Sequence, residues 1–220
     1  MNSVLEVGML ETEVKGLSQD AYEKIAAMIL SGELKGGAVL NDRRLSDSLG
    51  ISRTPVREAM GRLEGEGYLV RSGRTTIVSK IDLQDILQII SARILIEGET
   101  ARLAAEKIDE MCLQAMREAV EALLRNEDAS SDEHWSADDL VHLGIAEAAG
   151  NIYLAQIVAN LRKRTRIFGM KRIPSRFEPG IREHLAIIDA LHRRDAHAAS
   201  RLMSEHIASA RDGIINSFVG

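Results

Sequence analysis

Four residues in the C-terminal two thirds of the chain have side chains that can bind one metal ion. Asp138 and His142 are spaced i, i+4, so on a helix both project from one face and can coordinate the same ion. His184 lies 11 residues before Asp195 and His206 lies 11 residues after it, and two expected helices turn at this aspartate. In an antiparallel helical hairpin, the two imidazoles would lie at the same distance from the turn and therefore side by side. The spacing therefore predicts a site with one carboxylate and three imidazole ligands.

Each histidine taken singly is better explained as a hydrogen-bonded core or surface residue, but the joint placement of the three favours a metal site. His184 and His206 share their expected helix sides with apolar residues, so both should point inward, where a buried imidazole needs a partner. This ligand set suits Zn²⁺, with Ni²⁺, Mn²⁺ or Fe²⁺ as alternatives where waters or an effector complete the shell. The remaining histidines are expected to be exposed and uninvolved: His134, His192 and His197.

Arg93 lies on the same expected helix side as Ile86 and Ile90, where an unpaired cation would be costly. One possible partner is Glu97 at i+4, a pair worth only about 0.3 kcal/mol if exposed. The other is a carboxylate-bearing effector held between Arg93 and the metal, since a guanidinium binds a carboxylate through two parallel hydrogen bonds. Spacing alone favours neither partner.

Helices are the elements that would carry these residues, because strand signals nearly vanish after Asp82. The connections between the expected helices are short, which predicts an antiparallel bundle. The basic segment Leu161–Arg172 is interpreted as one of these helices, with solvated or pocket-lining basic residues, and not as a second nucleic-acid surface. The expected helices span about 82–107, 109–126, 135–149, 151–171, 178–193 and 195–217.

The N-terminal third has a different organisation, with three expected helices followed by a hairpin. Ser18 is expected to cap a first helix that ends before Gly32, and Asp42 a short second helix that Gly50 ends. Ser52 is expected to cap a third helix. Two short helices joined by a tight turn predict a helix-turn-helix, whose second helix inserts its N-terminal residues into the major groove of DNA.

Arg53, Thr54 and Arg57 are those N-terminal residues, and the hairpin that follows has Gly73 at its tip and resembles a wing. Arginine forks match the O6 and N7 atoms of guanine, and a glycine allows close approach of backbone to the minor groove. These arginines could instead form a merely solvated helix face. The turn, the helix caps, the arginine spacing and the hairpin all lie where a winged helix-turn-helix requires them, which favours DNA recognition.

The charge distribution agrees with this division, although the formal net charge is -5. Residues 1–80 carry 11 basic and 11 acidic side chains, so all of the excess acidity lies in residues 81–220. Residues 42–80 have a local charge of +3, where a DNA footprint would belong. The lone Cys112 excludes an intrachain disulfide, and no signal peptide or membrane span is evident. We therefore expect a cytoplasmic protein.

The segment Tyr22–Val78 resembles the DNA-binding domain of the GntR family of transcription regulators. Its centre has the sequence SGELKGGAVLNDRRLSDSLGISRTPVREAMGRLEGEGYLV. The segment departs from the family at Gly36, where proline is usual, and at Arg74 in the wing, where a second glycine is common. The resemblance implies DNA contacts by Arg43, Arg53, Thr54, Arg57 and Gly73.

Three later segments resemble the effector domain, called FCD, of FadR-type members of this family: ARILIEGETARLAA, DDLVHLGIAEAAGN and EHLAIIDALHRRDAHAASRLMSEH. The resemblance assigns the effector-binding role to Arg93. Val141 stands where the family commonly has phenylalanine, which alters packing but not ligation. Six expected helices are typical of the VanR-like branch. The resemblance implies metal ligation by Asp138, His142, His184 and His206.

We therefore predict a mainly α protein with a winged helix-turn-helix at 1–80 and an all-helical, antiparallel bundle at 81–220 that binds metal and effector and dimerises. The predicted function is a ligand-responsive transcription regulator, a repressor, that binds double-stranded operator DNA as a homodimer and responds to a small carboxylate. A direct metal sensor is one alternative. An Asp/His metalloenzyme is another, but no motif supplies a general base and the helix-turn-helix would be unexplained.

Overall fold

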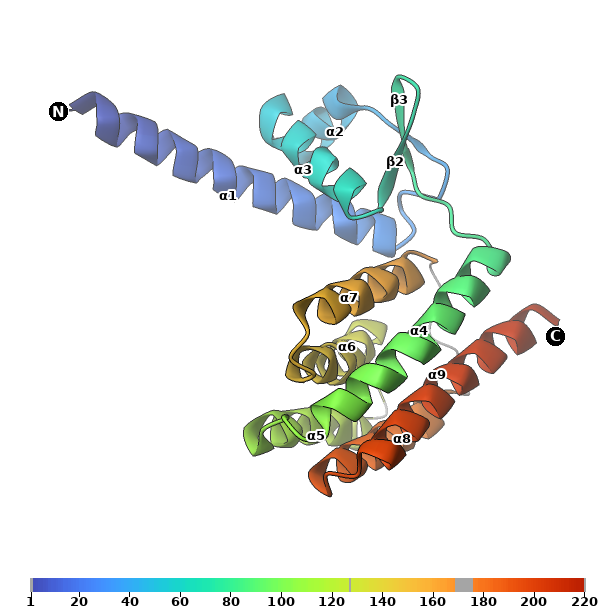
Figure 1. Cartoon of the computed structure of the whole chain (residues 1–220). Coiled ribbons are helices and arrows are strands. Elements are labelled where there is room, and N and C mark those ends of the chain that lie inside the picture. Colours follow the sequence, from blue (N-terminus) through green and yellow to red (C-terminus); the bar gives the residue numbers. More distant parts are fainter. Residues whose placement is uncertain (1, 127, 169–175, 220) are drawn as a thin grey trace. The chain divides into compact units, whose positions relative to one another are not determined.

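The computed structural model of the 220-residue chain describes residues 2–126, 128–168 and 176–219 (Figure 1). The chain divides into two compact units, and the main boundary between them in the sequence lies between Asp82 and Leu83. The first unit combines helices with a small antiparallel sheet in the strand order β1-β3-β2. Its elements are α1 (Asn2–Leu30), β1 (Val39–Leu40), α2 (Asp42–Leu49), α3 (Arg53–Gly65), β2 (Leu69–Ser72) and β3 (Thr75–Val78).

Helix α2 has well-defined signals at both ends. The Asn41 Oδ1 atom accepts hydrogen bonds from the backbone N–H groups of Arg43 and Arg44, at 3.0 and 3.1 Å. Asn41 is therefore the N-cap, and the prediction of Asp42 as the cap was wrong by one residue. Gly50 ends the helix at φ 65°, the left-handed conformation that glycine adopts without strain.

Helix α3 and the wing follow as the sequence predicts. Ser52 occupies the N-cap position with extended backbone but makes no side-chain cap hydrogen bond. Pro55 lies in the first turn of α3, where no internal amide bond is lost. Strands β2 and β3 pair antiparallel, with Ser72 opposite Thr75, and Gly73 at the tip has φ 62°.

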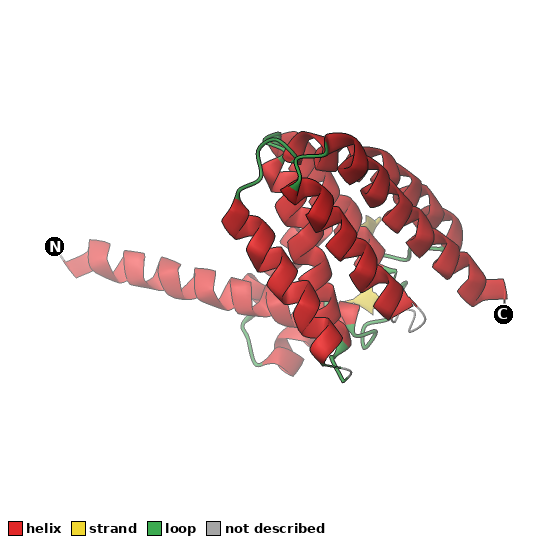
Figure 2. Ribbon diagram, turned by 90° about the horizontal axis from the view of Figure 1, so that it is seen from below, coloured by secondary structure: helices red, strands yellow, loops and turns green. Residues whose placement is uncertain are grey.

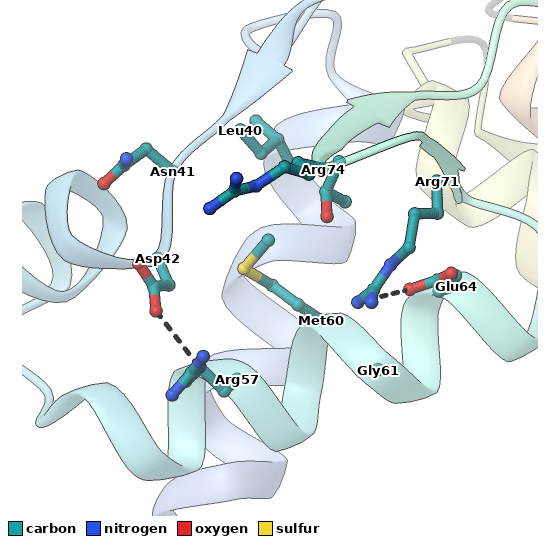
Figure 3. A pocket seen from close by; sticks show the side chains of 10 residues that line it. Leu40, Asn41, Asp42, Arg57, Met60, Gly61, Glu64, Arg71 and Arg74 are labelled. Carbon is teal, nitrogen blue, oxygen red and sulfur yellow. Dashed lines mark ion pairs between the residues drawn. The ribbon is translucent and has the colours of Figure 1, made fainter.

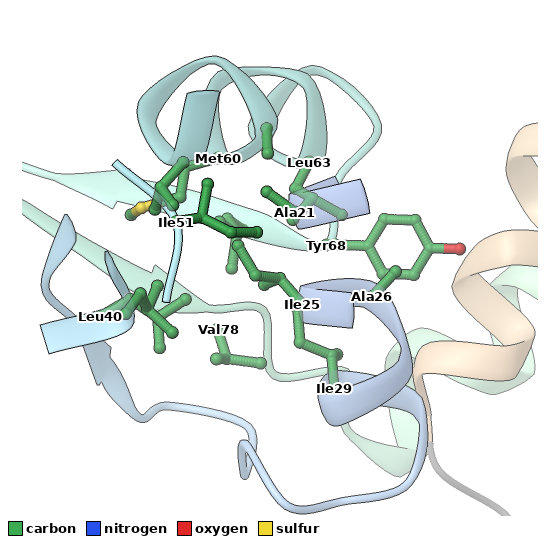
Figure 4. Close-up of a cluster of buried hydrophobic side chains, with 14 residues drawn as sticks. Ala21, Ile25, Ala26, Ile29, Leu40, Ile51, Met60, Leu63, Tyr68 and Val78 are labelled. Carbon is green, nitrogen blue, oxygen red and sulfur yellow. The ribbon is translucent and has the colours of Figure 1, made fainter. Parts of the chain in front are cut away.

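The core of the first unit lies between α1, α3 and the sheet (Figure 4). Ile25, Leu63 and Leu69 are fully buried, and burial stabilises side chains of this size by about 1.5 to 3 kcal/mol each. Helix α1 is longer than the predicted helix that starts at Ser18. No proline interrupts residues 2–17, which include several leucines and glutamates, so helix propensity continues toward the N-terminus.

The described part of the second unit consists of helices joined by loops (Figure 2). Helix α4 packs against α9 and α6, while α8 packs against α9 and α5. None of the helices in the described ranges is long and apolar enough to cross a membrane. The helices are α4 (Leu83–Ala104), α5 (Glu110–Arg125), α6 (Ser131–Ala148), α7 (Ile152–Ile167), α8 (Phe177–His192) and α9 (Ala196–Val219).

Within the described residues, all six helices match the predicted ranges to within about four residues, and the differences at α6, α8 and α7 have identifiable local causes or limits. Helix α6 begins four residues early because Ser130 and Glu133 form a capping box, in which each side chain accepts a hydrogen bond from the other's backbone N–H. Helix α8 begins at Phe177, so Pro179 lies in its first turn. Helix α7 ends at Ile167, and the predicted continuation to 171 and the Pro174 loop extend outside the described residues.

Candidate metal centre and nucleic-acid interface

Asp138 and His142 of α6, His184 of α8 and His206 of α9 come together in the interior of the second unit. One ligand atom from each of the four residues lies within 4.8 Å of the others. The Nε2 atom of His142 is 3.3 Å from the Nε2 atoms of both His184 and His206. The Oδ1 atom of Asp138 is 3.5 Å from His184 Nε2. The four predicted ligands therefore converge on one point.

The three imidazoles are buried, with exposed fractions of 1% for His142, 3% for His184 and 7% for His206. Burial lowers the pKa of His142 to about 4, and it also lowers the pKa of His184 well below its usual value. Neutral imidazole is the form that coordinates a metal ion. These two histidines are thus held in the metal-binding form at neutral pH.

Two glutamates contact the far sides of the imidazoles. The Nδ1 atom of His142 makes a short contact with Glu97 Oε2, and His206 Nδ1 lies 2.8 Å from Glu183 Oε2. Carboxylates in this position orient a ligating histidine and fix the proton on Nδ1, which leaves the Nε2 lone pair free. Lone pairs that converge without protons between them repel one another. A cation at their meeting point would remove that repulsion, so the donor set fits a metal ion.

Arg93 is buried and forms the ion pair with Glu97 that was one of its two predicted partners. Its Nε atom donates a 2.6 Å hydrogen bond to Glu97 Oε1, and its Nη1 atom is 3.4 Å from Thr165 Oγ1. Burial alone would raise the pKa of Glu97, but Arg93 and His142 hold it well below its usual value. Arg93 is therefore linked through Glu97 to the candidate metal ligand His142.

Arg162 of α7 is a further buried cation at the centre, and its role was not predicted individually. Its Nη2 atom donates to Asp138 Oδ2 at 2.7 Å, and its Nε atom donates to Asp139 Oδ1 at 3.0 Å. Its Nη1 atom is buried without a hydrogen-bond partner within the part of the chain that the structure describes. The only sequence signal for this residue was its place in the basic segment interpreted as solvated or pocket-lining.

The prediction that His134 is exposed was wrong. Because α6 begins at Ser131, His134 lies in its first turn, where it is buried and stacks on Phe177 with ring centroids 4.4 Å apart. It is not among the four clustered ligands. His192 and His197 are exposed as expected, and His192 Nδ1 lies 3.2 Å from Glu110 Oε1.

In the first unit, the predicted DNA-contacting residues lie on exposed positions at two helix ends. Arg53, Thr54 and Arg57 occupy the N-terminal part of α3, and Arg43 lies in the first turn of α2. The Asp42 Oδ2 atom accepts a 3.0 Å hydrogen bond from Arg53 Nη2 and is 3.1 Å from Arg57 Nε. The hydrogen bond from Arg53 lowers the pKa of Asp42.

A groove of about 320 Å³ runs between α3 and the wing (Figure 3). Arg57, Arg71 and Arg74 line it together with Glu64 and Asp42. The Arg71 guanidinium is paired with Glu64 at 3.4 Å, as Asp42 is paired with Arg57. Two of the three arginines that border the groove, Arg57 and Arg71, are therefore paired with acids.

Comparison with known proteins identifies both units. Residues 17–78 match the model described as "Bacterial regulatory proteins, gntR family", and residues 88–209 match the "FCD domain" model. The chain is also 31% identical to the HTH-type transcriptional regulator YcbG of Bacillus subtilis, over 91% of each chain. The chain belongs to the GntR family. It is a DNA-binding transcriptional regulator with an FCD domain, and the prediction of a regulator, not an enzyme, is confirmed.

Other GntR relatives cover nearly the whole chain as well. The Glc operon transcriptional activator of Escherichia coli is 26% identical over 93% of this chain and 91% of its own. The putative L-lactate dehydrogenase operon regulatory protein of E. coli is 30% identical over 87% of this chain and 84% of its own.

Solved GntR structures show the same fold. E. coli McbR/YncC covers 92% of this chain and 98% of its own, with a TM-score of 0.78 and 22% identity. A regulator from Rhodococcus sp. RHA1 covers 90% of this chain and 97% of its own, with a TM-score of 0.73 and 19% identity. The predicted fold class, a winged helix-turn-helix followed by a helical FCD domain, is confirmed.

Proposed function

We propose that this GntR regulator binds a divalent ion at Asp138, His142, His184 and His206, and that a small carboxylate bound beside the ion controls its affinity for operator DNA. The observation that carries the proposal is the convergence of three buried imidazole Nε2 atoms and a carboxylate on one point, with two buried guanidiniums nearby. Zn²⁺ fits this donor set best, with Ni²⁺, Mn²⁺ and Fe²⁺ as alternatives. When bound, the ion supplies a Lewis-acidic position for a carboxylate oxygen.

Buried donors around the centre support an anionic effector. Arg93 and Arg162 are both buried, and both lie near the buried carboxylate of Glu97. An effector carboxylate could bind the ion at an open coordination position. It would also offer an acceptor to Arg162 Nη1, which lacks one among the described residues.

We assign the DNA contacts to the first 80 residues, with Arg43, Arg53, Thr54, Arg57 and Gly73 at the interface, and effector binding and dimerisation to residues 81–220. In a symmetric dimer each α3 would enter the major groove of one half-site, with Gly73 at the wing tip close to the minor groove. The groove between α3 and the wing then suits the phosphate backbone of one strand. We propose that the effector favours a state with weaker operator affinity, so that the protein acts as a repressor.

The unsatisfied Nη1 donor of Arg162 favours this mechanism over direct metal sensing. Arg93 and the other donors of Arg162 are paired with carboxylates, whereas Nη1 has no acceptor among the described residues and an organic acid could supply one. The name of one relative, a regulator of an L-lactate dehydrogenase operon, suggests L-lactate as the first acid to test.

The test measures release of operator DNA by fluorescence anisotropy. An operator duplex is first selected from a random library with Zn²⁺-loaded protein, and then L-lactate and related 2-hydroxy acids are titrated into the complex. We expect acid to release DNA from the Zn²⁺-loaded protein and not from the metal-free protein. Equal release from both would refute the role of the ion. A complex that dissociates when Zn²⁺ is removed but responds to none of the acids would support a direct metal sensor.

A further inference from the structure

We infer that Asp42 is a positioning residue: it holds the Arg53 and Arg57 guanidiniums in place for base recognition and thereby sets the ratio of operator binding to non-specific DNA binding. The inference rests on the DNA contacts proposed above for these two arginines. It concerns an acid that touches both arginines from another helix.

The geometry connects two helix ends through one oxygen atom. Asp42 is the first residue of α2, Arg53 is the first residue of α3, and Arg57 lies one turn further along α3. Both guanidiniums meet the same Asp42 atom, Oδ2, at 3.0 and 3.1 Å. Figure 3 shows the Asp42 carboxylate directed at Arg57 beside the groove.

The Asp42 carboxylate is less exposed to solvent than the two guanidiniums that it orients. The Asp42 side chain is 20% exposed, whereas the side chains of Arg53 and Arg57 are 58% and 70% exposed. The backbone carbonyl of Asp42 accepts a 2.7 Å hydrogen bond from Ser46 Oγ, and Asn41 caps the helix immediately before it. The backbone that carries the Asp42 side chain is thus held at the start of α2, and the carboxylate is less exposed than the two guanidiniums that it contacts.

The contacts leave the recognition atoms of both arginines available. Arg57 meets Asp42 through Nε, which leaves both of its Nη groups for a base edge. Arg53 uses one Nη2 donor and keeps Nε and Nη1. A guanidinium that is already oriented loses less side-chain freedom when it binds guanine, so the acid favours specific contacts.

The same acid acts in the opposite direction on non-specific binding. Non-specific affinity comes almost entirely from attraction between basic side chains and phosphates, and a carboxylate beside them weakens that attraction. Removing the charge of Asp42 should therefore weaken operator binding and strengthen binding to other DNA. An acid that only stabilises the N-terminus of α2 through the helix dipole would not separate the two.

The experiment compares Asp42→Asn and Asp42→Glu with Asp47→Asn in the full-length protein. Asp47 is an exposed acid in the same helix, so its variant makes the same charge change away from the arginines. Fluorescence anisotropy measures the affinity of each protein for the selected operator and for a scrambled duplex of equal length at several salt concentrations. Thermal unfolding verifies that each variant is folded.

We expect Asp42→Asn to lower the ratio of operator to scrambled affinity about tenfold, as for the partial loss of a bidentate base contact. The scrambled duplex should bind at least as tightly as to the wild type. Asp42→Glu should restore most of the ratio, and Asp47→Asn should leave it unchanged. If Asp42→Asn changes both affinities by the same factor in either direction, the inference is wrong.

A parallel Arg57→Ala variant separates this inference from the proposed function. Loss of operator affinity in Arg57→Ala together with an unchanged ratio in Asp42→Asn would refute only the positioning role. Unchanged operator affinity in Arg57→Ala would refute the proposed DNA contact itself.

Discussion

At the scale of single residues, two imidazoles of the candidate metal centre have a glutamate in contact with the ring nitrogen that faces away from the other ligands. Glu97 contacts His142, and Glu183 contacts His206, on the side away from the convergence point. Such partners keep the proton on Nδ1 and increase the basicity of Nε2. Affinity for the ion should therefore depend on glutamates that are not themselves ligands.

We predict that Glu97→Gln lowers the affinity for Zn²⁺ about 10- to 100-fold, because an amide accepts the His142 proton without carrying charge. Chelator competition measures this affinity. Glu99→Gln is the matched control: Glu99 lies on the same helix, is exposed and pairs only with Arg102 among the contacts described for it. Equal Zn²⁺ affinity in both variants would mean that Glu97 does not act through His142.

The clustering of the four candidate ligands could be predicted from the sequence, whereas the glutamates that contact them could not. Asp138 and His142 share a helix face, and His184 and His206 are symmetric about a turn, so local geometry brings each pair together. Glu97 is 45 residues from His142, and only the packing of α4 against α6 brings the two side chains into contact. Glu183 is adjacent to His184 in the chain yet contacts His206 across the α8–α9 hairpin.

At the scale of elements, the close packing of α4 on α9 depends on a glycine. A Cβ at Gly98 would lie 2.4 Å from Ser204 Oγ and 3.4 Å from the backbone carbonyl of Ser200. Ser204 Oγ donates a hydrogen bond to the carbonyl of Ile94, which it would give up in moving aside. Because α4 carries Glu97 and Arg93 while α9 carries His206, this contact also sets the spacing of these residues in the candidate metal centre.

We predict that Gly98→Ala destabilises the protein by about 1 to 3 kcal/mol, because overpacking outweighs the better helix propensity of alanine. Urea unfolding measures the free energy of unfolding. Gly180→Ala is the control, since Gly180 lies in α8 with open space around its Cβ position. At Gly180 we therefore expect only the gain in helix propensity, without overpacking. Equal stability changes in the two variants would contradict the close-packing account.

Element types were predictable along the described chain, and two clear errors fell at the starts of α1 and α6. Helix periodicity identified α4 to α9, and the turn residues identified the wing. The start of α1 was missed because Ser18 resembles a cap but lies inside a continuous helix. The start of α6 was missed although its signal, Ser130 followed by Glu133, is present in the sequence.

At the scale of the whole molecule, one helix-turn-helix reads only a half-site, so we predict a symmetric dimer in solution. Exposed apolar side chains on the second unit, including Leu95 of α4 and Ile152 and Tyr153 of α7, offer surface for such contacts. Sedimentation equilibrium of the free protein and of its operator complex measures the assembly. A monomer that binds its operator tightly would contradict the prediction.

The central claim, that the second unit is built around a bound ion, is tested most directly by metal content. Full-length protein equilibrated with Zn²⁺ and dialysed is analysed by elemental mass spectrometry, alongside Asp138→Asn, His206→Ala and the exposed-histidine control His197→Ala. We predict about one ion per chain in the wild type and in the control, and loss of most of it in the two ligand variants. A wild type without bound ion, or a His206→Ala variant with as much ion as the wild type, would contradict the account.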